Sequence, residues 1–346
     1  MPPSASMGVG PSEFARPGER IRAVGDTVYL LRARGVHAVK VPGGTPALSV
    51  PYPVATLSDG TESVLAFRDF WIDESALFGV VSGAFYRAAT TGGSAALLPG
   101  HSAPSPDAEN RGFYVRAGET VYRATFLPPA AYGIERYSLS GGTASELLRF
   151  NAPSLRMPVV GEGSLYYVDR AEGDAEGTAS IFALSLDTGT STAIARGFQS
   201  PSILGFDGNL YVTDTPSAAG FEQLFRIRAD HRVEKLTIPY NVILHLEISF
   251  AGFKGVGYFT AGALYQHPSD RRGDSRDVVM RIRPDSDTVE MVRCLPNSYG
   301  GPAMPTPNVS PFVIDLTAGD SALYLARALV DRSNDTWEDQ ILEVAR

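Results

Sequence analysis

The chain has 346 residues, of which 44% are hydrophobic and 20% are charged, a composition typical of a globular protein with a large core. A net charge of −8 argues against nucleic acid as a partner, because phosphate recognition needs a basic surface. The single cysteine, Cys294, leaves no intramolecular disulfide to form. No segment reads as a secretory signal or a membrane span, so we expect a cytoplasmic protein, or a periplasmic or secreted one if a leader precedes this sequence.

Seven times along the chain, a short apolar strand carries an aromatic residue. The copies are Val28-Tyr29, Leu77-Phe78, Val121-Tyr122, Leu165-Tyr166, Leu210-Tyr211, Gly257-Tyr258 and Leu323-Tyr324. Most copies follow the previous one by about 45 residues, which is the spacing of four-stranded propeller blades. The repeat therefore predicts an all-β protein, a single seven-bladed β-propeller with four antiparallel strands in each blade.

In chain order, the predicted blades form one domain and span about residues 20–50, 64–99, 112–150, 156–196, 202–238, 242–295 and 311–346. The fifth blade shows the pattern best. Ser202–Phe206 is its first strand, and Asp207-Gly208 is a hairpin turn whose residues tolerate positive φ. Residues 209–214, 223–228 and 233–238 complete the sheet, because each is short, rich in β-branched and aromatic residues, and bounded by turn formers.

The last blade has only three predicted strands, at 311–316, 321–330 and 340–346, before the sequence ends. Residues 12–17 (Ser-Glu-Phe-Ala-Arg-Pro) would supply the fourth strand and close the ring, because an open sheet edge would otherwise remain. We expect residues 1–11, which precede this strand, to be disordered.

The succession of a strand, the Asp207-Gly208 turn, Leu-Tyr-Val-Thr-Asp at 210–214 and Phe-Arg-Ile at 225–227 resembles seven-bladed propellers of the TolB, NHL and virginiamycin B lyase-like kinds. The resemblance covers nearly the whole chain and concerns the scaffold, and a fold alone does not carry a function. Virginiamycin B lyase-like enzymes use His and Glu around a magnesium ion, and no position of this sequence matches theirs residue by residue.

The predicted connections fall into a short set and a long set. In a propeller, the loops between second and third strands and the links between blades lie on one face, and the other turns lie on the opposite face. The long segments all belong to the first group: 51–63, 100–111, 171–178, 215–222, 264–277, 296–310 and 331–339. Their placement favours a binding face, although insertions at tolerant positions would give the same pattern.

His245 and Glu247 are the candidate catalytic residues. They are two positions apart on the predicted first strand of blade 6, residues 242–250, so the alternation of a strand places both on one side. Such a pair could act as a general base or help to hold a divalent cation such as Mg²⁺ or Ca²⁺. A hydrogen-bonded pair that only stabilises the channel is the alternative we favour.

The candidate binding residues come from the long segments. Charged or imidazole side chains in two of them could converge on a ligand, and two aromatic residues could act as anchors. These residues are His101, Asp107, Arg111, His267, Arg272, Tyr299 and Trp337. With five histidines in the chain, two of them far from this face, we expect no histidine-rich metal centre.

Two functions fit these observations. The first is a binding propeller that docks a peptide, a partner protein or a small molecule on the long-loop face and at the channel mouth. The second is a metal-assisted lyase or lactonase-type enzyme at the central channel, which needs several convergent acidic or imidazole side chains. The sequence favours the binding propeller, with no nucleic acid, no membrane span and a monomeric state, and it leaves catalysis open.

Overall fold

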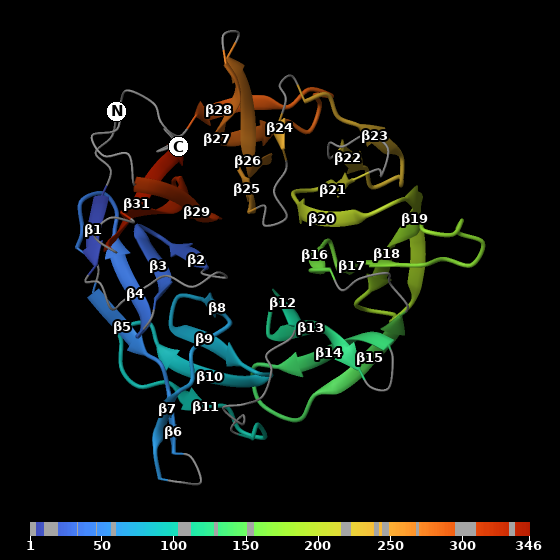
Figure 1. The fold of residues 1–346 in the computed structure, drawn as a ribbon. Helices are drawn as coiled ribbons and strands as arrows, with labels where there is room; N and C mark the ends of the chain where they lie inside the picture. The colour runs from blue at the N-terminus through green and yellow to red at the C-terminus, as the bar shows by residue number, and fades with distance from the viewer. Residues whose placement is uncertain are drawn as a thin grey trace. The chain divides into compact units, whose positions relative to one another are not determined.

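The computed structural model describes residues 5–9, 20–32, 34–45, 47–56, 60–102, 112–127, 131–150, 156–215, 223–238, 242–243, 249–267, 270–294, 309–331 and 336–346. In these ranges every regular element is a β-strand. The strands form the seven antiparallel blades of a β-propeller (Figure 1), so the predicted fold class is confirmed. Contacts divide the chain into two compact units, and the prediction of a single domain stays a prediction.

Unit 1 comprises residues 1–110, 139–142 and 296–346 and contains blades 1, 2 and 7. The strands of blade 1 are β2 (Ile21–Val24), β3 (Thr27–Arg32), β4 (Gly35–Lys40) and β5 (Ala47–Pro51). Those of blade 2 are β8 (Asp69–Ile72), β9 (Ala76–Val81), β10 (Ala84–Ala89) and β11 (Ala96–Leu97), and the link before it holds β6 (Val54–Thr56) and β7 (Glu62–Val64). Blade 7 has β29 (Val309–Ala318), β30 (Leu323–Asp331), β31 (Thr336–Ala345) and β1 (Ala5–Val9).

Unit 2 comprises residues 111–138 and 143–295 and contains blades 3 to 6. Blade 3 has β12 (Gly112–Ala117), β13 (Thr120–Leu127), β14 (Ala131–Ser138) and β15 (Ser145–Phe150). Blade 4 has β16 (Val159–Gly161), β17 (Ser164–Asp169), β18 (Ala179–Ser185) and β19 (Ser191–Phe198). Blade 5 has β20 (Pro201–Phe206), β21 (Leu210–Asp214), β22 (Gln223–Ile227) and β23 (Val233–Lys235). Blade 6 has β24 (Val242–Ile243), β25 (Phe250–Phe253), β26 (Val256–His267), β27 (Asp270–Ile282) and β28 (Glu290–Cys294).

An N-terminal strand completes the last blade, as the sequence predicts, but it is not the predicted one. β1 pairs antiparallel with β31, from Ala5 opposite Ile341 to Val9 opposite Trp337. The strand therefore lies within residues 1–11, which we expected to be disordered, whereas residues 12–17 lie outside the described residues. Both candidates are short, and the outer edge of β31 can pair with any segment that presents free backbone groups, so local sequence alone does not choose between them.

Two predicted loops contain strands instead. Residues 264–267 and 270–277 form the ends of β26 and β27, which pair from Gly257 opposite Ile282 to His267 opposite Asp270, with a register shift between Tyr265 and His267. In the 51–63 segment, β6 and β7 form a hairpin with Val54 opposite Val64. The first strand of blade 2 consequently begins at Asp69 rather than at residue 64. At the ends of β26 and β27, cross-strand pairing overrides the low strand propensity of Gly and Asp.

The first strand of blade 6 is interrupted. Its two parts, β24 and β25, both pair with β26, and Ile243 is opposite Gly262 while Phe250 is opposite Phe259. The chain thus advances seven positions on one side against three on the other, so the predicted regular strand over 242–250 is wrong. The shared side of His245 and Glu247 was inferred from that strand, and both residues lie outside the described residues.

The repeated aromatic residue lies in the second strand of each blade, and Tyr166 and Tyr211 each pack against an aromatic ring of the following blade. Six copies are buried and Tyr166 is half-buried. In unit 2, Tyr166 stacks on Phe206 of the next blade with ring centroids 5.6 Å apart. A Cβ atom on Gly161 would lie 2.3 Å from the Phe206 ring, so only glycine leaves room for this contact. Aromatic pairs of this kind stabilise a core beyond the area they bury.

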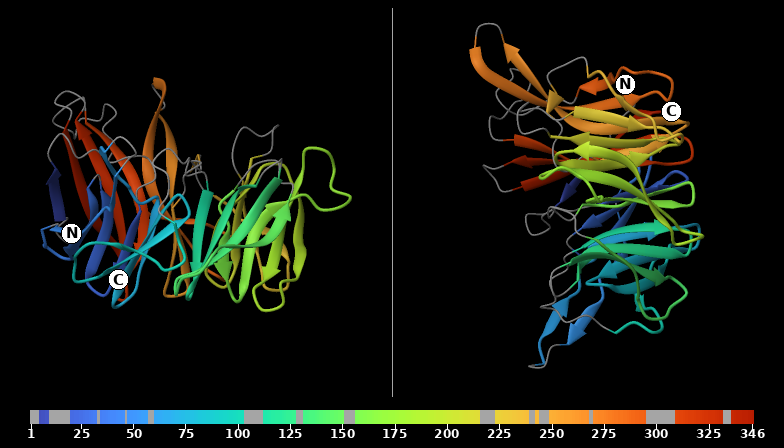
Figure 2. Two further views of the ribbon diagram at one scale, coloured as in Figure 1. Left: turned by 90° about the horizontal axis from the view of Figure 1, so that it is seen from below. Right: turned by 90° about the vertical axis from the view of Figure 1, so that its right-hand side faces the viewer.

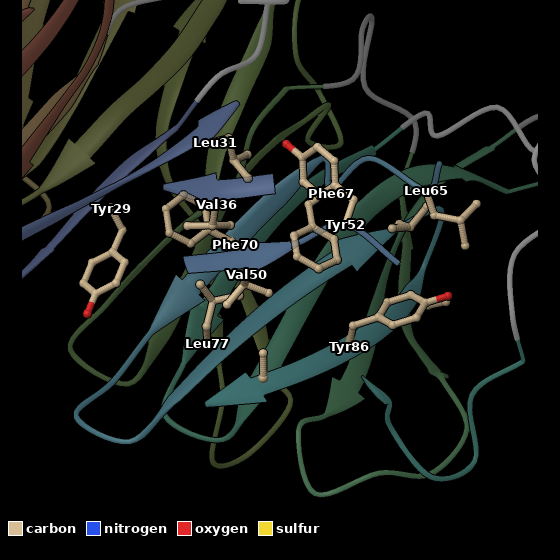
Figure 3. Packing of buried hydrophobic residues seen from close by; sticks show 13 residues of the cluster. Tyr29, Leu31, Val36, Val50, Tyr52, Leu65, Phe67, Phe70, Leu77 and Tyr86 are labelled. Carbon is tan, nitrogen blue, oxygen red and sulfur yellow. The ribbon is translucent and has the colours of Figure 1, made fainter. Parts of the chain in front are cut away.

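Blades 1 and 2 of unit 1 share a continuous hydrophobic core (Figure 3). Leu31, Val36 and Val50 from blade 1 face Phe70 and Leu77 from blade 2, and all five side chains are buried. Burying each such side chain contributes about 1.5–3 kcal/mol, so this interface holds the two sheets face to face.

Arg226 joins blades 5 and 6 of unit 2. Its side chain is 1% exposed and its Nη1 donates to the carbonyl oxygens of Pro284 at 2.8 Å and Ser286 at 2.9 Å. Its Nη2 donates to Glu234 Oε2 at 2.7 Å, and Arg228 Nε donates to the other carboxylate oxygen at 2.8 Å. A buried guanidinium is tolerated only with such partners, so the cluster fixes the β27–β28 turn on blade 5.

Because of this cluster, the stability of unit 2 should decrease at acidic pH. The hydrogen bonds from Arg228, and then from Arg226, lower the pKa of Glu234 from 4.5 to about 2. A lowered carboxylate pKa adds stability above the unfolded value near pH 4.5, and this addition disappears as the pH falls toward 2. We expect Glu234→Gln to lower the free energy of unfolding most above pH 4.5. The difference from the unmodified protein, measured by urea titration, should shrink between pH 4.5 and 2, and a constant difference would contradict the assignment.

Candidate functional site

An ion network joins the first strands of the three blades in unit 1. Arg22 on β2 lies between Asp69 on β8 and Asp315 on β29. Its Nη2 is 3.1 Å from Asp69 Oδ1, and its Nη1 is 3.4 Å from Asp315 Oδ2. Arg20 Nε lies 3.9 Å from Asp69 Oδ2. The two guanidinium groups and the two carboxylates therefore neutralise each other where these three strands meet.

The backbone completes the environment of both carboxylates, which are buried. Asp69 Oδ1 accepts a hydrogen bond from the Phe70 amide at 2.8 Å, and Asp315 Oδ1 accepts one from the Leu316 amide at 2.9 Å. The Ile21 amide donates to Asp315 Oδ2 at 3.2 Å. Buried carboxylates need such donors to remain charged. The network uses its charges to hold three strands together, and we assign it a structural role.

The β6–β7 hairpin presents an apolar pair to solvent. Val54 and Val64 lie directly opposite each other, and they are 54% and 58% exposed. The intervening Ala55 is half-buried and packs against the shared core of blades 1 and 2. Because side chains alternate along a strand, one face of the hairpin rests on the core and the other carries the two valines. Isolated exposed valines are common, but an opposed pair forms a small apolar contact surface.

A rigid base supports this hairpin. The Leu65 amide donates to the Pro53 carbonyl oxygen at 2.8 Å, which continues the ladder beyond the last strand pair. Tyr52 and Phe67 flank the hairpin in sequence, are both buried, and meet edge to face with ring centroids 5.2 Å apart (Figure 3). A two-stranded hairpin alone is marginally stable in water, so this aromatic contact is what allows β6 and β7 to persist outside the four-stranded sheet.

Neither the ion network nor the β6–β7 hairpin was predicted from the sequence. Asp59-Gly60, between two short alternating segments, is a recognisable hairpin signal and could have located β6 and β7. For the ion network, the signal is an acidic residue followed by an apolar one within the first strand of a blade, as in Asp69-Phe70 and Asp315-Leu316. That signal does not identify Arg22 as the shared partner.

Of the predicted site residues, only His101 has a described side chain. It follows blade 2 and is half-buried, with its ring 5.3 Å from that of Phe85 in an edge contact. Burial lowers the pKa of His101 below its ordinary value of 6.5, which favours the uncharged imidazole at neutral pH. This packing anchors the beginning of the 100–111 segment to blade 2.

The other candidates divide into two groups. For His267 on β26, Arg272 on β27 and Trp337 on β31, the structure describes the backbone alone. Asp107, Arg111, His245, Glu247 and Tyr299 lie outside the described residues. His267 and Arg272 lie on the same hairpin, β26–β27. The convergence of the other candidate residues on one ligand stays a prediction.

Within the described ranges, no group of three or more His, Cys, Asp or Glu side chains could hold a metal ion. No helix in those ranges is long and apolar enough to cross a membrane.

By sequence, the chain matches no family model and no curated protein. Its structure is similar to a puromycin-hydrolyzing peptidase from Mycobacterium tuberculosis, with a TM-score of 0.56 and 14% identity over 99% of this chain and 55% of that chain. Oligogalacturonate lyase from Vibrio parahaemolyticus matches with a TM-score of 0.47 and 11% identity over 86% and 85% of the two chains. TolB from Acinetobacter baumannii matches with a TM-score of 0.39 and 11% identity over 95% and 80%.

The chain therefore spans about half the length of the peptidase. At 14% identity the likeness is one of fold alone, because a propeller scaffold hosts many unrelated functions. The scaffold resemblance inferred from the sequence is confirmed at this level.

Substitution of one carboxylate in the ion network tests its structural role directly. Asp315→Asn replaces an oxygen acceptor by a donor where the Ile21 amide and Arg22 already donate, so we expect the free energy of unfolding to fall by about 1–3 kcal/mol. Asp320→Asn makes the same chemical change five positions further on, at an exposed turn, and should alter stability by less than about 0.5 kcal/mol. Equal effects in urea titrations would contradict the assigned role of Asp315.

Proposed function

We propose that this protein is a binding propeller that captures a peptide or a partner protein, with the β6–β7 hairpin as a principal contact. The observation that carries the proposal is the exposed, directly opposed pair of Val54 and Val64 on a hairpin anchored to the core. The hairpin lies in the link between blades 1 and 2, among the connections that the sequence assigns to the long-loop face.

The geometry favours a macromolecular ligand over a small one. A small molecule is usually held in a concave pocket that covers most of its surface, whereas two valines on an open hairpin can be covered only by another apolar surface. Apolar anchors of this kind supply much of the affinity when a partner excludes water from them. The firm base formed by Tyr52 and Phe67 also supports binding, because a preformed contact surface loses little entropy when it is occupied.

The alternative of a metal-assisted lyase or lactonase depends on His245 and Glu247. Both residues lie outside the described residues. A catalytic pair with Mg²⁺ or Ca²⁺ therefore stays a prediction from the sequence. The binding proposal draws on described side chains, and we therefore prefer it.

A library of random linear peptides displayed on phage, selected on the immobilised protein, provides the probe. We expect the selected peptides to carry apolar residues. Their dissociation constants should rise about tenfold or more for Val54→Ser combined with Val64→Ser, because this change removes most of the apolar area offered at the hairpin. Isothermal titration with the synthesised peptides gives the measurement.

Val233→Ser is the matched control, because Val233 on β23 is also exposed, at 42%, but has no place in the hairpin. It should leave the affinities unchanged, and all variants should keep the thermal midpoint of the unmodified protein. The proposal is wrong if no peptide is enriched, or if the selected peptides bind the hairpin variant as tightly as the unmodified protein.

A further inference from the structure

The β6–β7 hairpin has free backbone edges. Residues 54–56 pair with residues 62–64, and no third strand within the described ranges joins either of them. The hairpin, blue in both figures, projects beyond the strands of blade 2 in Figure 1 and in the right-hand view of Figure 2. An exposed strand edge of this kind is a template for a further strand.

The hydrogen-bond pattern of the hairpin shows which backbone groups face outward. The Leu65 amide donates to the Pro53 carbonyl oxygen at 2.8 Å, so these two residues form a hydrogen-bonded pair. Hydrogen-bonded and non-hydrogen-bonded pairs alternate along an antiparallel ladder. Val64 and Glu62 therefore belong to non-hydrogen-bonded pairs, and their N–H and C=O groups point away from β6. Together they offer two donors and two acceptors to a strand that adds to the outer edge of β7.

The outer edge of β7 is freer than that of β6. Two positions before Val54, the Tyr52 amide already donates to the Arg34 carbonyl oxygen at 3.1 Å. Two positions after Val64, Ala66 is exposed and has no backbone hydrogen bond to another described residue. An added strand can therefore run further along β7 than along β6.

The side chains on β7 define what an added strand should carry. Glu62 and Val64 are exposed, and Ser63 between them is half-buried. A neighbouring strand would place one side chain beside Val64 and another, two positions along, beside Glu62 on the same face. Glu62 is the one charged residue in the described parts of the hairpin, 54–56 and 60–64, and it forms no ion pair with another described residue. Its carboxylate favours a positive neighbour.

We propose that the partner adds an extended segment antiparallel to the outer edge of β7, with an apolar side chain beside Val64 and a lysine or arginine two positions later beside Glu62. This inference rests on the proposed function and names its ligand, a peptide or protein segment with the pattern apolar–x–basic. Backbone hydrogen bonds supply affinity in this mode of recognition, and the alternate side chains supply specificity. The antiparallel direction follows because antiparallel pairs are the more stable per residue.

Two synthetic peptides test the charge preference. One is Thr-Thr-Val-Thr-Lys-Thr-Thr, and the other has Glu in place of Lys. Each is immobilised, and binding of the protein is measured by surface plasmon resonance at about 0.15 M salt, where distant charges are screened. The unmodified protein should bind the Lys peptide about fivefold or more tightly than the Glu peptide, and Glu62→Lys should reverse this order, because facing charges then change from opposite to like.

Glu74→Lys is the matched control, because it makes the same change in net charge at an exposed position between β8 and β9. It should keep the preference for the Lys peptide. Equal binding of the two peptides, or a preference that Glu62→Lys does not alter, overturns the proposal.

Methylation of single peptide amides tests the strand addition itself. In the Lys peptide, the Val amide should face β7, so its N-methylation should weaken binding about fivefold or more through loss of a hydrogen bond. The amide of the following Thr points away from β7, and its N-methylation should leave the affinity unchanged. Equal effects of the two methyl groups would overturn the proposed pairing.

The outcomes separate this inference from the proposed function. If Val54→Ser with Val64→Ser weakens both peptides equally, while the charge and the methyl groups have no effect, the hairpin contact stands and strand addition is wrong. If neither peptide binds and the random library yields no enriched peptide, both proposals are wrong.

Discussion

The structure depends on the burial of one blade against the next. Each blade is a sheet that presents apolar side chains on both faces, so it is stable only when its neighbours cover them. Within unit 2, the repeated aromatic residues Tyr166 and Tyr211 lie at this contact. In blades 4 and 5, Tyr166 meets Phe206 over the space left by Gly161. The aromatic repeat in the sequence therefore reflects the packing of one blade against the next.

Packing of the blade faces leaves the backbone groups at strand edges and ends without hydrogen-bond partners. This chain supplies those partners in different ways. β1 covers the outer edge of β31. Buried carboxylates on β8 and β29 accept backbone amides and hold Arg22 between them. At β6–β7, and at the ends of β26 and β27 beyond Ala263 and Val278, the chain instead has strand pairs that are not needed to complete a four-stranded blade. The proposed function uses the first of these additions.

Much of the fold could be predicted from the sequence, because the repeated aromatic residues and Gly/Asp turns are local signals tied to a spacing. The outer strand of blade 7 was placed wrongly, since a short segment shows by itself nothing of the edge it will meet. The ends of β26 and β27 were predicted as a loop because Gly273 and Asp274 have low strand propensity, and pairing across the hairpin outweighs it.

The site was less predictable than the fold. Arg22 is 47 residues from Asp69 and 293 residues from Asp315, and no local pattern links such distant groups. The exposure of Val54 and Val64 follows from which hairpin face Ala55 turns toward the core, a tertiary property. His101 packs edge to face on Phe85, and its predicted role in binding stays a prediction.

The central claim is that β6–β7 and the ends of β26 and β27 are paired strands where the sequence predicts loops. Amide hydrogen exchange of the ends of β26 and β27 tests it most directly. The amides of residues 264–265 and 274–277 that face the neighbouring strand should be protected, and those on the outer edges should exchange rapidly. This alternation is the result the account predicts. Uniformly rapid exchange across both segments would contradict it.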